Sequence, residues 1–289
     1  MFSGTWVAVT TPFKDDGSVE REILATHIKY LSNYVDGFVL FGTTGEGISL
    51  TDDERLAIMQ DCANSKPIIA GISQILPEKA CAHARQAQGY ASGIMLTPPY
   101  YIKPTTDDMH RYFKLVHDNT DMPIVLYNNP ARFSVDIPSY LVAELVRECP
   151  RIVAIKNANT SPESMYSMSQ VVPVFAGEDS YYHDFLRHKA VGIISTGANI
   201  APHWYREILN AWLNNDLHTL DQSKNKIADL CRTLSDAPSP VGLKYMMSKF
   251  NLSSAALRFP LACPLKLMQK IDEYCKTTDN LTHDTFKKQ

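Results

Sequence analysis

The sequence predicts an α/β protein built as a (β/α)8 barrel, the TIM-barrel fold, with a C-terminal helical extension. Eight short apolar runs recur along the 289-residue chain, and stretches with the period of an amphipathic helix separate them. The runs are evenly spaced, since Gly71, Thr97, Tyr127 and Lys156 lie 26 to 30 residues apart at their ends. A repeated strand–helix unit gives parallel strands joined by right-handed crossovers. Eight such units fit a closed barrel.

The strand candidates are short and rich in β-branched residues, as strands buried on both faces are. A doubly wound open sheet is the competing architecture, but no G-x-G-x-x-G follows the first run. In chain order, the runs are Thr5–Thr10, Gly37–Gly42, Pro67–Gly71, Gly93–Pro99, Pro123–Pro130, Arg151–Lys156, Val172–Glu178 and Val191–Thr196.

The helices between the runs carry recognisable start signals. Thr51 precedes an acidic first turn, and Glu54 follows three residues later, which predicts an N-terminal capping box. The stretch APHWYREILNAWLNN supplies the eighth barrel helix. We therefore predict a catalytic barrel over residues 1–216 and a helical extension over 217–289 that packs on it, with no linker between them.

Composition and charge restrict the class of protein. Apolar residues make up 45% of the chain, enough for a large core, and the net charge of −3 argues against a nucleic-acid binder. No apolar run approaches the ~20 residues that cross a bilayer, and the N-terminus lacks the basic region of a signal peptide. The six cysteines form no C-x-x-C pair, as expected of free thiols in the cytoplasm. The nine histidines show no metal-binding spacing, so no metal is expected.

Lys156 is the most informative residue at a strand end, because lysine is almost never buried without a partner. One interpretation is that Lys156 begins a loop and points into water. The other is that it lies in the barrel mouth, since active sites of this fold occupy the carboxyl ends of the strands. There, loss of hydration favours a neutral amine, which attacks carbonyl carbons to form a Schiff base.

Two neighbouring strand ends support the second interpretation. Tyr127 ends the preceding strand, and its phenol can move protons during imine formation, although a structural tyrosine capping the core is the alternative. Strand two ends in FGTTGEG, whose glycines let backbone N–H groups approach an anion, although tight turns use the same residues. With the hydroxyls of Thr43 and Thr44, this loop can seat a carboxylate. Together these features predict Schiff-base chemistry of the aldolase type, which needs no metal.

Six stretches in order along the chain, FGTTGEG, LTPPYY, LYNNPAR, VAIK, PSPVGLK and LRFPL, resemble the dihydrodipicolinate synthase family of pyruvate-dependent lyases. The resemblance implies condensation of pyruvate with L-aspartate 4-semialdehyde to give 4-hydroxy-tetrahydrodipicolinate, on the route to lysine and diaminopimelate. It implies no cofactor beyond pyruvate bound covalently to Lys156. It also implies a cytoplasmic homo-oligomer, a tetramer built as a dimer of dimers, with no nucleic-acid or membrane partner.

The resemblance assigns roles residue by residue. Lys156 matches the Schiff-base lysine, and Tyr127, Thr44 and Tyr101 match a hydrogen-bonded proton relay. In the family, the residue that Tyr101 matches reaches into the site of the neighbouring subunit. The residues implied to bind substrate are Thr43 beside the pyruvate carboxylate, Arg132 at the carboxylate of the aldehyde, and Ile194 through its backbone.

The sequence departs from the family pattern after Tyr127. Asn-Val-Pro-Ser-Arg-Thr is usual there, whereas this chain has Asn128 to Phe133, so that Phe133 replaces a small polar residue. Gly47 stands where Ser or Ala is common, a change expected to matter less. Other pyruvate-dependent aldolases, acting on sialic acid, 2-keto-3-deoxygluconate or 4-hydroxy-2-oxoglutarate, therefore remain alternatives, and so does a non-catalytic barrel. Arg132 favours a carboxylated aldehyde over a sugar.

The resemblance also bears on feedback by lysine. Lysine-sensitive members present an asparagine and a glutamate to the amino acid at the dimer interface, near the segment GISQILPEKA of this chain. Aligned without gaps, those positions hold Ile75 and Lys79, which predicts weak or absent inhibition. A shift of the alignment by one or two residues would put Glu78 in place of Lys79.

Overall fold

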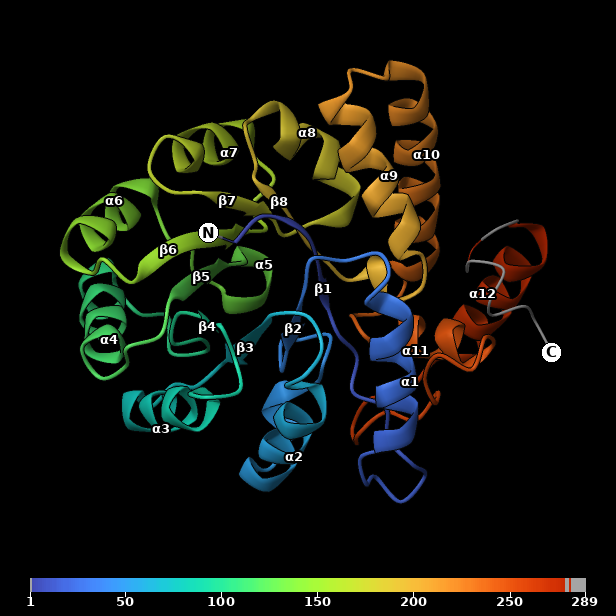
Figure 1. Cartoon of the computed structure of the whole chain (residues 1–289), viewed down its shortest axis with the longest axis horizontal. Coiled ribbons are helices and arrows are strands. Elements are labelled where there is room, and N and C mark those ends of the chain that lie inside the picture. Colours follow the sequence, from blue (N-terminus) through green and yellow to red (C-terminus); the bar gives the residue numbers. More distant parts are fainter. Residues whose placement is uncertain (1, 279–280, 282–289) are drawn as a thin grey trace.

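The computed structural model describes residues 2–278 and 281 and contains the predicted closed barrel. Its eight parallel strands follow one another in chain order, and β1 pairs with both β2 and β8 (Figure 1). The open-sheet alternative is therefore wrong. The strands are β1 Gly4–Ala8, β2 Gly37–Leu40, β3 Ile68–Ile72, β4 Gly93–Leu96, β5 Ile124–Asn128, β6 Ile152–Asn157, β7 Val174–Ala176 and β8 Gly192–Ser195.

Helices surround this barrel, and further helices lie to one side of it (Figure 1). The barrel helices are α1 Arg21–Leu31, α2 Asp52–Cys62, α3 Pro77–Ala87, α4 Thr106–Asp118, α6 Ser139–Glu148, α7 Pro162–Ser169, α8 Tyr182–Arg187 and α9 Pro202–Leu213. A short helix, α5 Pro130–Phe133, follows β5. The C-terminal helices are α10 Leu217–Leu234, α11 Val241–Ser248 and α12 Leu265–Thr277.

The strand ends differ from the predicted runs by a few residues. The run Pro123–Pro130 was expected to be extended throughout, but the strand ends at Asn128 and α5 begins at Pro130. The Asn129 side chain accepts a hydrogen bond from the backbone of Arg132, and Pro130 suits the first position of a helix. By contrast, β6 continues one residue past Lys156.

The predicted capping box at the start of α2 is confirmed. The Thr51 hydroxyl accepts a hydrogen bond from the Glu54 backbone at 3.2 Å, and the Glu54 carboxylate accepts one from the Thr51 backbone at 2.9 Å. None of the helices within the described part of the chain has the length and apolar content of a membrane-spanning segment.

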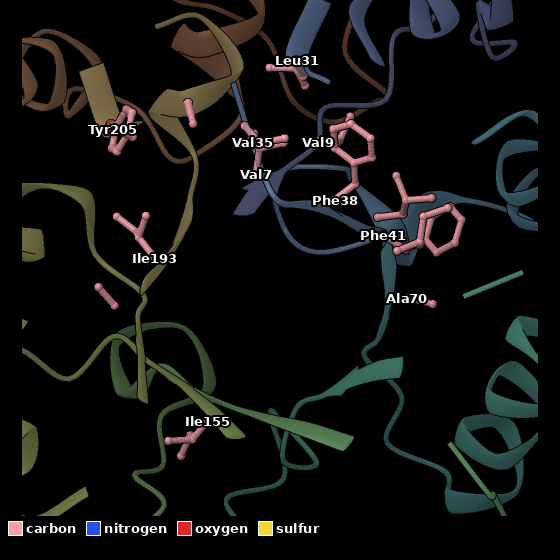
Figure 2. Packing of buried hydrophobic residues seen from close by; sticks show 14 of the residues in the cluster. Val7, Val9, Leu31, Val35, Phe38, Phe41, Ala70, Ile155, Ile193 and Tyr205 are labelled. Atoms are coloured by element: carbon pink, nitrogen blue, oxygen red, sulfur yellow. The ribbon is translucent and has the colours of Figure 1, made fainter. Parts of the chain in front are cut away.

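The hydrophobic core has two parts, because successive strand residues point to opposite sides of the barrel wall. The larger part lies between strands and helices, and Val7, Phe38 and Ile155 belong to it (Figure 2). The smaller part fills the barrel interior. It consists of Trp6, Ala8, Val39, Ile69, Met95, Val125, Tyr127, Phe133, Ala154, Phe175 and Ile194.

The C-terminal extension is joined to the barrel by packing and by a buried ion pair. Helix α10 packs along α9, as Figure 1 shows. Lys244 on α11 is fully buried, and its Nζ lies 2.8 Å from a carboxylate oxygen of Glu46 in the loop after β2. The proposed boundary at residue 216 stays a prediction, and residues 279–280 and 282–289 of that extension lie outside the described residues.

Candidate active site

Lys156 points into the barrel because of its place in β6. Ala154 belongs to the interior core and Ile155 to the outer core, so Lys156, two residues after Ala154, faces inward again. Its side chain is 4% exposed, and its Nζ lies 4.5 Å from the centroid of the Tyr127 ring. No described residue forms an ion pair or hydrogen bond with this amine, although its charge partly offsets the rise that burial causes in the pKa values of Glu178 and Asp179. The interpretation of Lys156 as a loop residue pointing into water is therefore wrong.

Tyr127 neighbours Lys156 as predicted, since the two residues are paired in the register of β5 and β6. The Asn129 side-chain nitrogen donates a hydrogen bond to the Tyr127 phenol oxygen at 3.1 Å. The Asn129 side-chain oxygen accepts one from the backbone of Arg132 at 3.2 Å. One amide therefore fixes both the phenol and the start of α5. Sequence reasoning noted Asn129 only as a departure from the family pattern and missed this role.

A cavity of about 270 Å³ opens above the Lys156 amine at the carboxyl end of the barrel. It is lined by five of the predicted site residues, namely Thr43, Thr44, Tyr127, Arg132 and Lys156.

Tyr101 and Ile194 do not line this cavity. Tyr101 is 86% exposed on the loop after β4, with a backbone φ of +72°. Ile194 is fully buried in the interior core, and its register partner on β1 is Trp6. The roles expected of both residues stay predictions.

The glycine-rich loop after β2 uses its N–H groups differently from the expectation. Those of Gly45, Glu46 and Gly47 donate to carbonyl groups of the same loop, so they do not form an open anion nest. The backbone N–H groups of Thr43 and Thr44 have no acceptor among the described residues. The N–H groups of Thr43 and Thr44 are therefore the donors of this loop that can bind an anion.

Gly47 has a structural role that the sequence did not suggest. A Cβ atom at this position would lie 2.0 Å from the backbone oxygen of Phe41, well inside van der Waals contact. The path of this loop therefore requires glycine here.

The Thr44 hydroxyl contacts two other hydroxyl groups. Its Oγ1 lies 3.1 Å from Oγ1 of Thr196 and 3.3 Å from Oγ of Ser239. Thr44 is 4% exposed, and all three residues line the Lys156 cavity. Within the described single chain, the Thr44 hydroxyl makes no direct hydrogen bond to Tyr127.

Arg132 lies between the Lys156 cavity and a second cavity of about 420 Å³. Its guanidinium forms no ion pair or hydrogen bond with a described residue, which leaves it available to an anion. Phe133 is buried beside it and packs edge-to-face on Tyr127, with 5.3 Å between ring centroids. The Phe133 ring therefore covers one side of the Tyr127 phenol and forms an apolar part of the wall of the second cavity.

Two acidic residues after β7 complete the Lys156 cavity. Burial, with a smaller effect of Asp179, raises the pKa of the Glu178 carboxyl. Burial also raises the pKa of Asp179, although hydrogen bonds from Gly197 and Tyr205 oppose the change. The predicted strand run Val172–Glu178 ends at the first of these residues, but the sequence analysis assigned neither of them a role. The feature that could have identified them is the position of two adjacent carboxyl groups at the carboxyl end of a barrel strand.

Replacing Glu178 by glutamine should change how stability depends on pH. The pKa of Glu178 in the folded protein lies above its usual 4.5. The folded state therefore holds this proton more tightly than the unfolded chain, and the resulting stabilisation is lost as pH rises through the folded-state pKa. Glutamine does not titrate, so the variant should gain stability relative to wild type as pH rises from 4.5. Urea unfolding of both proteins at several pH values measures this, and parallel curves would contradict it.

One group of possible metal ligands exists among the described residues. His110 on α4 meets Glu144 and Glu148 on α6, with the ligand atoms within 4.8 Å of one another. Neither glutamate is buried, and none of the three residues lines the Lys156 cavity. Pattern reasoning looked for closely spaced histidines and did not anticipate this group. We assign no metal to it.

A closed (β/α)8 barrel whose mouth holds a buried, unpaired lysine amine beside a tyrosine defines the class of Schiff-base-forming TIM-barrel lyases. The model of the dihydrodipicolinate synthetase family matches residues 1–274. The chain therefore belongs to this family, as the resemblance indicated.

Individual relatives agree with the family match. The 4-hydroxy-tetrahydrodipicolinate synthase of Methanothrix thermoacetophila is 32% identical over 272 residues, which cover 91% of this chain and 92% of that protein. That of Agrobacterium fabrum is 32% identical over 276 residues, covering 92% and 94%. The crystal structure of dihydrodipicolinate synthase from Aquifex aeolicus has a TM-score of 0.91 at 28% identity and covers 95% of this chain and 97% of that one.

Proposed function

We propose that the chain is a 4-hydroxy-tetrahydrodipicolinate synthase, which condenses pyruvate with L-aspartate 4-semialdehyde through a Schiff base on Lys156. The observation that carries the proposal is the Lys156 amine, which is buried, unpaired among the described residues and open to a cavity that also holds Tyr127 and Arg132. A neutral amine at this position can attack a carbonyl carbon to form the Schiff base.

In the proposed reaction, the Lys156 amine attacks the ketone carbon of pyruvate, and the resulting carbinolamine loses water to give an iminium ion. Loss of a proton from the methyl group then gives an enamine, whose carbon attacks the aldehyde. The pyruvate carboxylate lies at the free N–H groups of Thr43 and Thr44. Tyr127, held by Asn129, transfers protons at the reacting atoms.

Arg132 supports an acidic aldehyde as the second substrate. Its guanidinium lines the cavity without an ion pair to a described residue, and a bidentate donor of this kind suits a carboxylate. The neutral hydroxyls of a sugar chain would leave this charge unpaired. Aldolases for sialic acid or 2-keto-3-deoxygluconate are therefore weaker candidates, and so is a non-catalytic barrel, since Lys156, Tyr127, Thr43, Thr44 and Arg132 share one cavity.

A turnover assay with purified protein, pyruvate and a panel of aldehydes tests the proposal. Aspartate semialdehyde should give the highest kcat/KM, and uncharged sugar aldehydes the lowest. The opposite ranking would establish one of the other aldolase activities.

We also propose a homo-oligomer, a tetramer built as a dimer of dimers, whose subunits exchange Tyr101. Large apolar side chains are exposed on the loops after β2, β3 and β4, namely Ile48, Leu76, Tyr101 and Ile102. These strands are neighbours in the barrel, so their loops share one side of the rim. Such a surface suits a second copy of the chain.

Mixing two inactive variants tests the exchange of Tyr101. Tyr101→Phe subunits keep Lys156, and Lys156→Ala subunits keep Tyr101, so a mixed dimer has one complete site. Random exchange in equal amounts should restore about a quarter of the wild-type sites. The assay is turnover after dissociation and reassembly, with each variant reassembled alone as the control. Mixed dimers without activity would count against a shared site.

Inhibition by L-lysine should be weak or absent. Lys79 is exposed in the first turn of α3, where the ammonium of a bound lysine would require an anion. Like charges ~4 Å apart repel by about 1 kcal/mol in water and about 4 kcal/mol at an effective dielectric of 20. This repulsion weakens binding by roughly fivefold to a thousandfold. A steady-state titration measures it, and half-inhibition well below millimolar would contradict this placement of Lys79 or the chemistry assigned to it.

A further inference from the structure

Three hydroxyl groups from distant parts of the chain form a row at the Lys156 cavity. Thr44 lies in the middle, 3.1 Å from the Thr196 hydroxyl and 3.3 Å from that of Ser239. Thr44 follows β2, Thr196 follows β8, and Ser239 belongs to the C-terminal extension between α10 and α11. The extension therefore supplies a polar group directly to the cavity.

Each end of the row is held differently. The backbone N–H groups of Thr196 and Gly197 donate to the buried carboxyl of Asp179, at 3.3 and 2.6 Å, which fixes the inner end. Ser239 is half-buried and lines both the Lys156 cavity and the larger cavity beside it. The row thus runs from the Lys156 cavity to the larger cavity beside it.

A hydroxyl group donates one proton and accepts through two lone pairs, so a row of three can pass a proton along without net change. The buried Thr44 hydroxyl would be poorly oriented if it stood alone, because its torsion is free to rotate. With a hydroxyl on each side, it can accept from one neighbour while it donates to the other, in either direction. Thr44 can then give a proton at the reacting atoms and regain one from its neighbour.

We propose that Thr196 and Ser239 are positioning residues that act through Thr44 and form with it a proton relay inside a single chain. The proposal rests on the proposed function. Carbinolamine dehydration breaks the carbon–oxygen bond, consumes one proton and releases water, leaving the iminium ion. Enamine formation then returns one proton from the methyl carbon. The row carries the first proton inward from the larger cavity through Ser239 and Thr44, and the second one outward.

The half-reaction with pyruvate alone isolates these steps. Exchange of the pyruvate methyl protons for deuterium, followed by NMR, requires the Schiff base and the enamine but no aldehyde. Thr196→Val and Ser239→Ala should each slow the exchange by about two- to tenfold at saturating pyruvate, the range that loss of one neutral hydrogen bond gives. The apparent KM for pyruvate should stay unchanged. The solvent isotope effect should increase, because proton transfer then limits the rate more strongly.

Matched variants separate a relay from a general disturbance of the cavity. Thr196→Ser and Ser239→Thr keep the hydroxyl groups and should restore most of the rate. Ser235→Ala removes another hydroxyl that lines the cavity, but that group donates to the backbone of Arg232 and should be neutral.

The outcomes distinguish the two proposals. A wild-type protein that exchanges no deuterium refutes the proposed function and the relay together. The relay alone is refuted if the wild type exchanges deuterium and neither Thr196→Val nor Ser239→Ala slows the exchange. It is also refuted if these variants slow the exchange but leave the isotope effect unchanged and the hydroxyl-bearing variants do not restore the rate. Thr196 and Ser239 lie on separate elements of the structure. If one of the two variants misfolds, the other still tests the relay.

Discussion

Replacing Lys156 by methionine will lower turnover by roughly 10⁴- to 10⁶-fold, the loss that follows removal of a residue at the centre of a cooperating catalytic group. Methionine keeps much of the volume of the lysine stem but has no nucleophile. The side chain is 4% exposed, and no described residue forms an ion pair with the amine. The substitution therefore breaks no ion pair, although it removes a positive charge that partly offsets the rise that burial causes in the pKa values of Glu178 and Asp179. Steady-state kinetics gives the rate, and urea unfolding shows that the fold is kept.

A surface lysine provides the control for this experiment. Lys266→Met lies on α12, where the side chain is exposed, and should behave as wild type in both measurements. A Lys156→Met protein that retained more than about a hundredth of the wild-type rate would contradict the role of Lys156. Binding and orienting the substrates would then be enough to explain the catalysis.

Replacing Arg132 by alanine will reduce kcat/KM for aspartate semialdehyde by roughly 10- to 150-fold, since a hydrogen bond to a charged group contributes about 1.5–3 kcal/mol. The guanidinium lines the cavity and forms no ion pair with a described side chain, although its charge partly offsets the rise that burial causes in the pKa of Glu178. Pyruvate binding should persist, because the N–H groups of Thr43 and Thr44 lie on a different loop. Steady-state kinetics with the aldehyde varied at saturating pyruvate measures the effect.

Arg132→Lys is the informative companion variant. It keeps the positive charge but loses the planar pair of donors, so its activity should lie between wild type and Arg132→Ala. Equal kcat/KM for all three proteins would remove Arg132 from the aldehyde site. A parallel loss of pyruvate trapping would instead place it at the pyruvate site.

The fold was predictable from the sequence because barrel strands produce a repeated local signal. Each buried strand is a short apolar run, and each intervening helix has its own period and start signal, as at Thr51. The exact strand ends were less predictable, because they depend on where pairing between neighbours stops. Pro130 belongs to a short helix rather than to the end of β5, since the Asn129 side chain caps that helix.

The pairing of Lys156 with Tyr127 was predictable for the same reason. Residues at corresponding ends of consecutive parallel strands become neighbours, and here they share a register position. The contacts among the hydroxyl groups that line the Lys156 cavity were not predictable. Thr196 and Ser239 meet Thr44 across 152 and 195 residues of sequence, and neither residue belongs to a motif that points to the other.

Residues that act between elements or between subunits mark the limit of sequence reasoning. The Lys244–Glu46 pair links the extension to the glycine-rich loop, yet each residue alone resembles an ordinary surface charge. Tyr101 was assigned by resemblance only, and its exposure in the single chain is what a residue used by a neighbouring subunit would show. The function proposed for Tyr101 depends on an assembly that local patterns do not encode.

Covalent trapping tests the central claim most directly. The protein is incubated with pyruvate and sodium borohydride, digested, and examined by peptide mass spectrometry. The account predicts one reduced pyruvyl group on the peptide that contains Lys156, and no labelling of the Lys156→Met variant. Labelling at a different lysine, or no labelling of the wild-type protein, would contradict a Schiff base at Lys156.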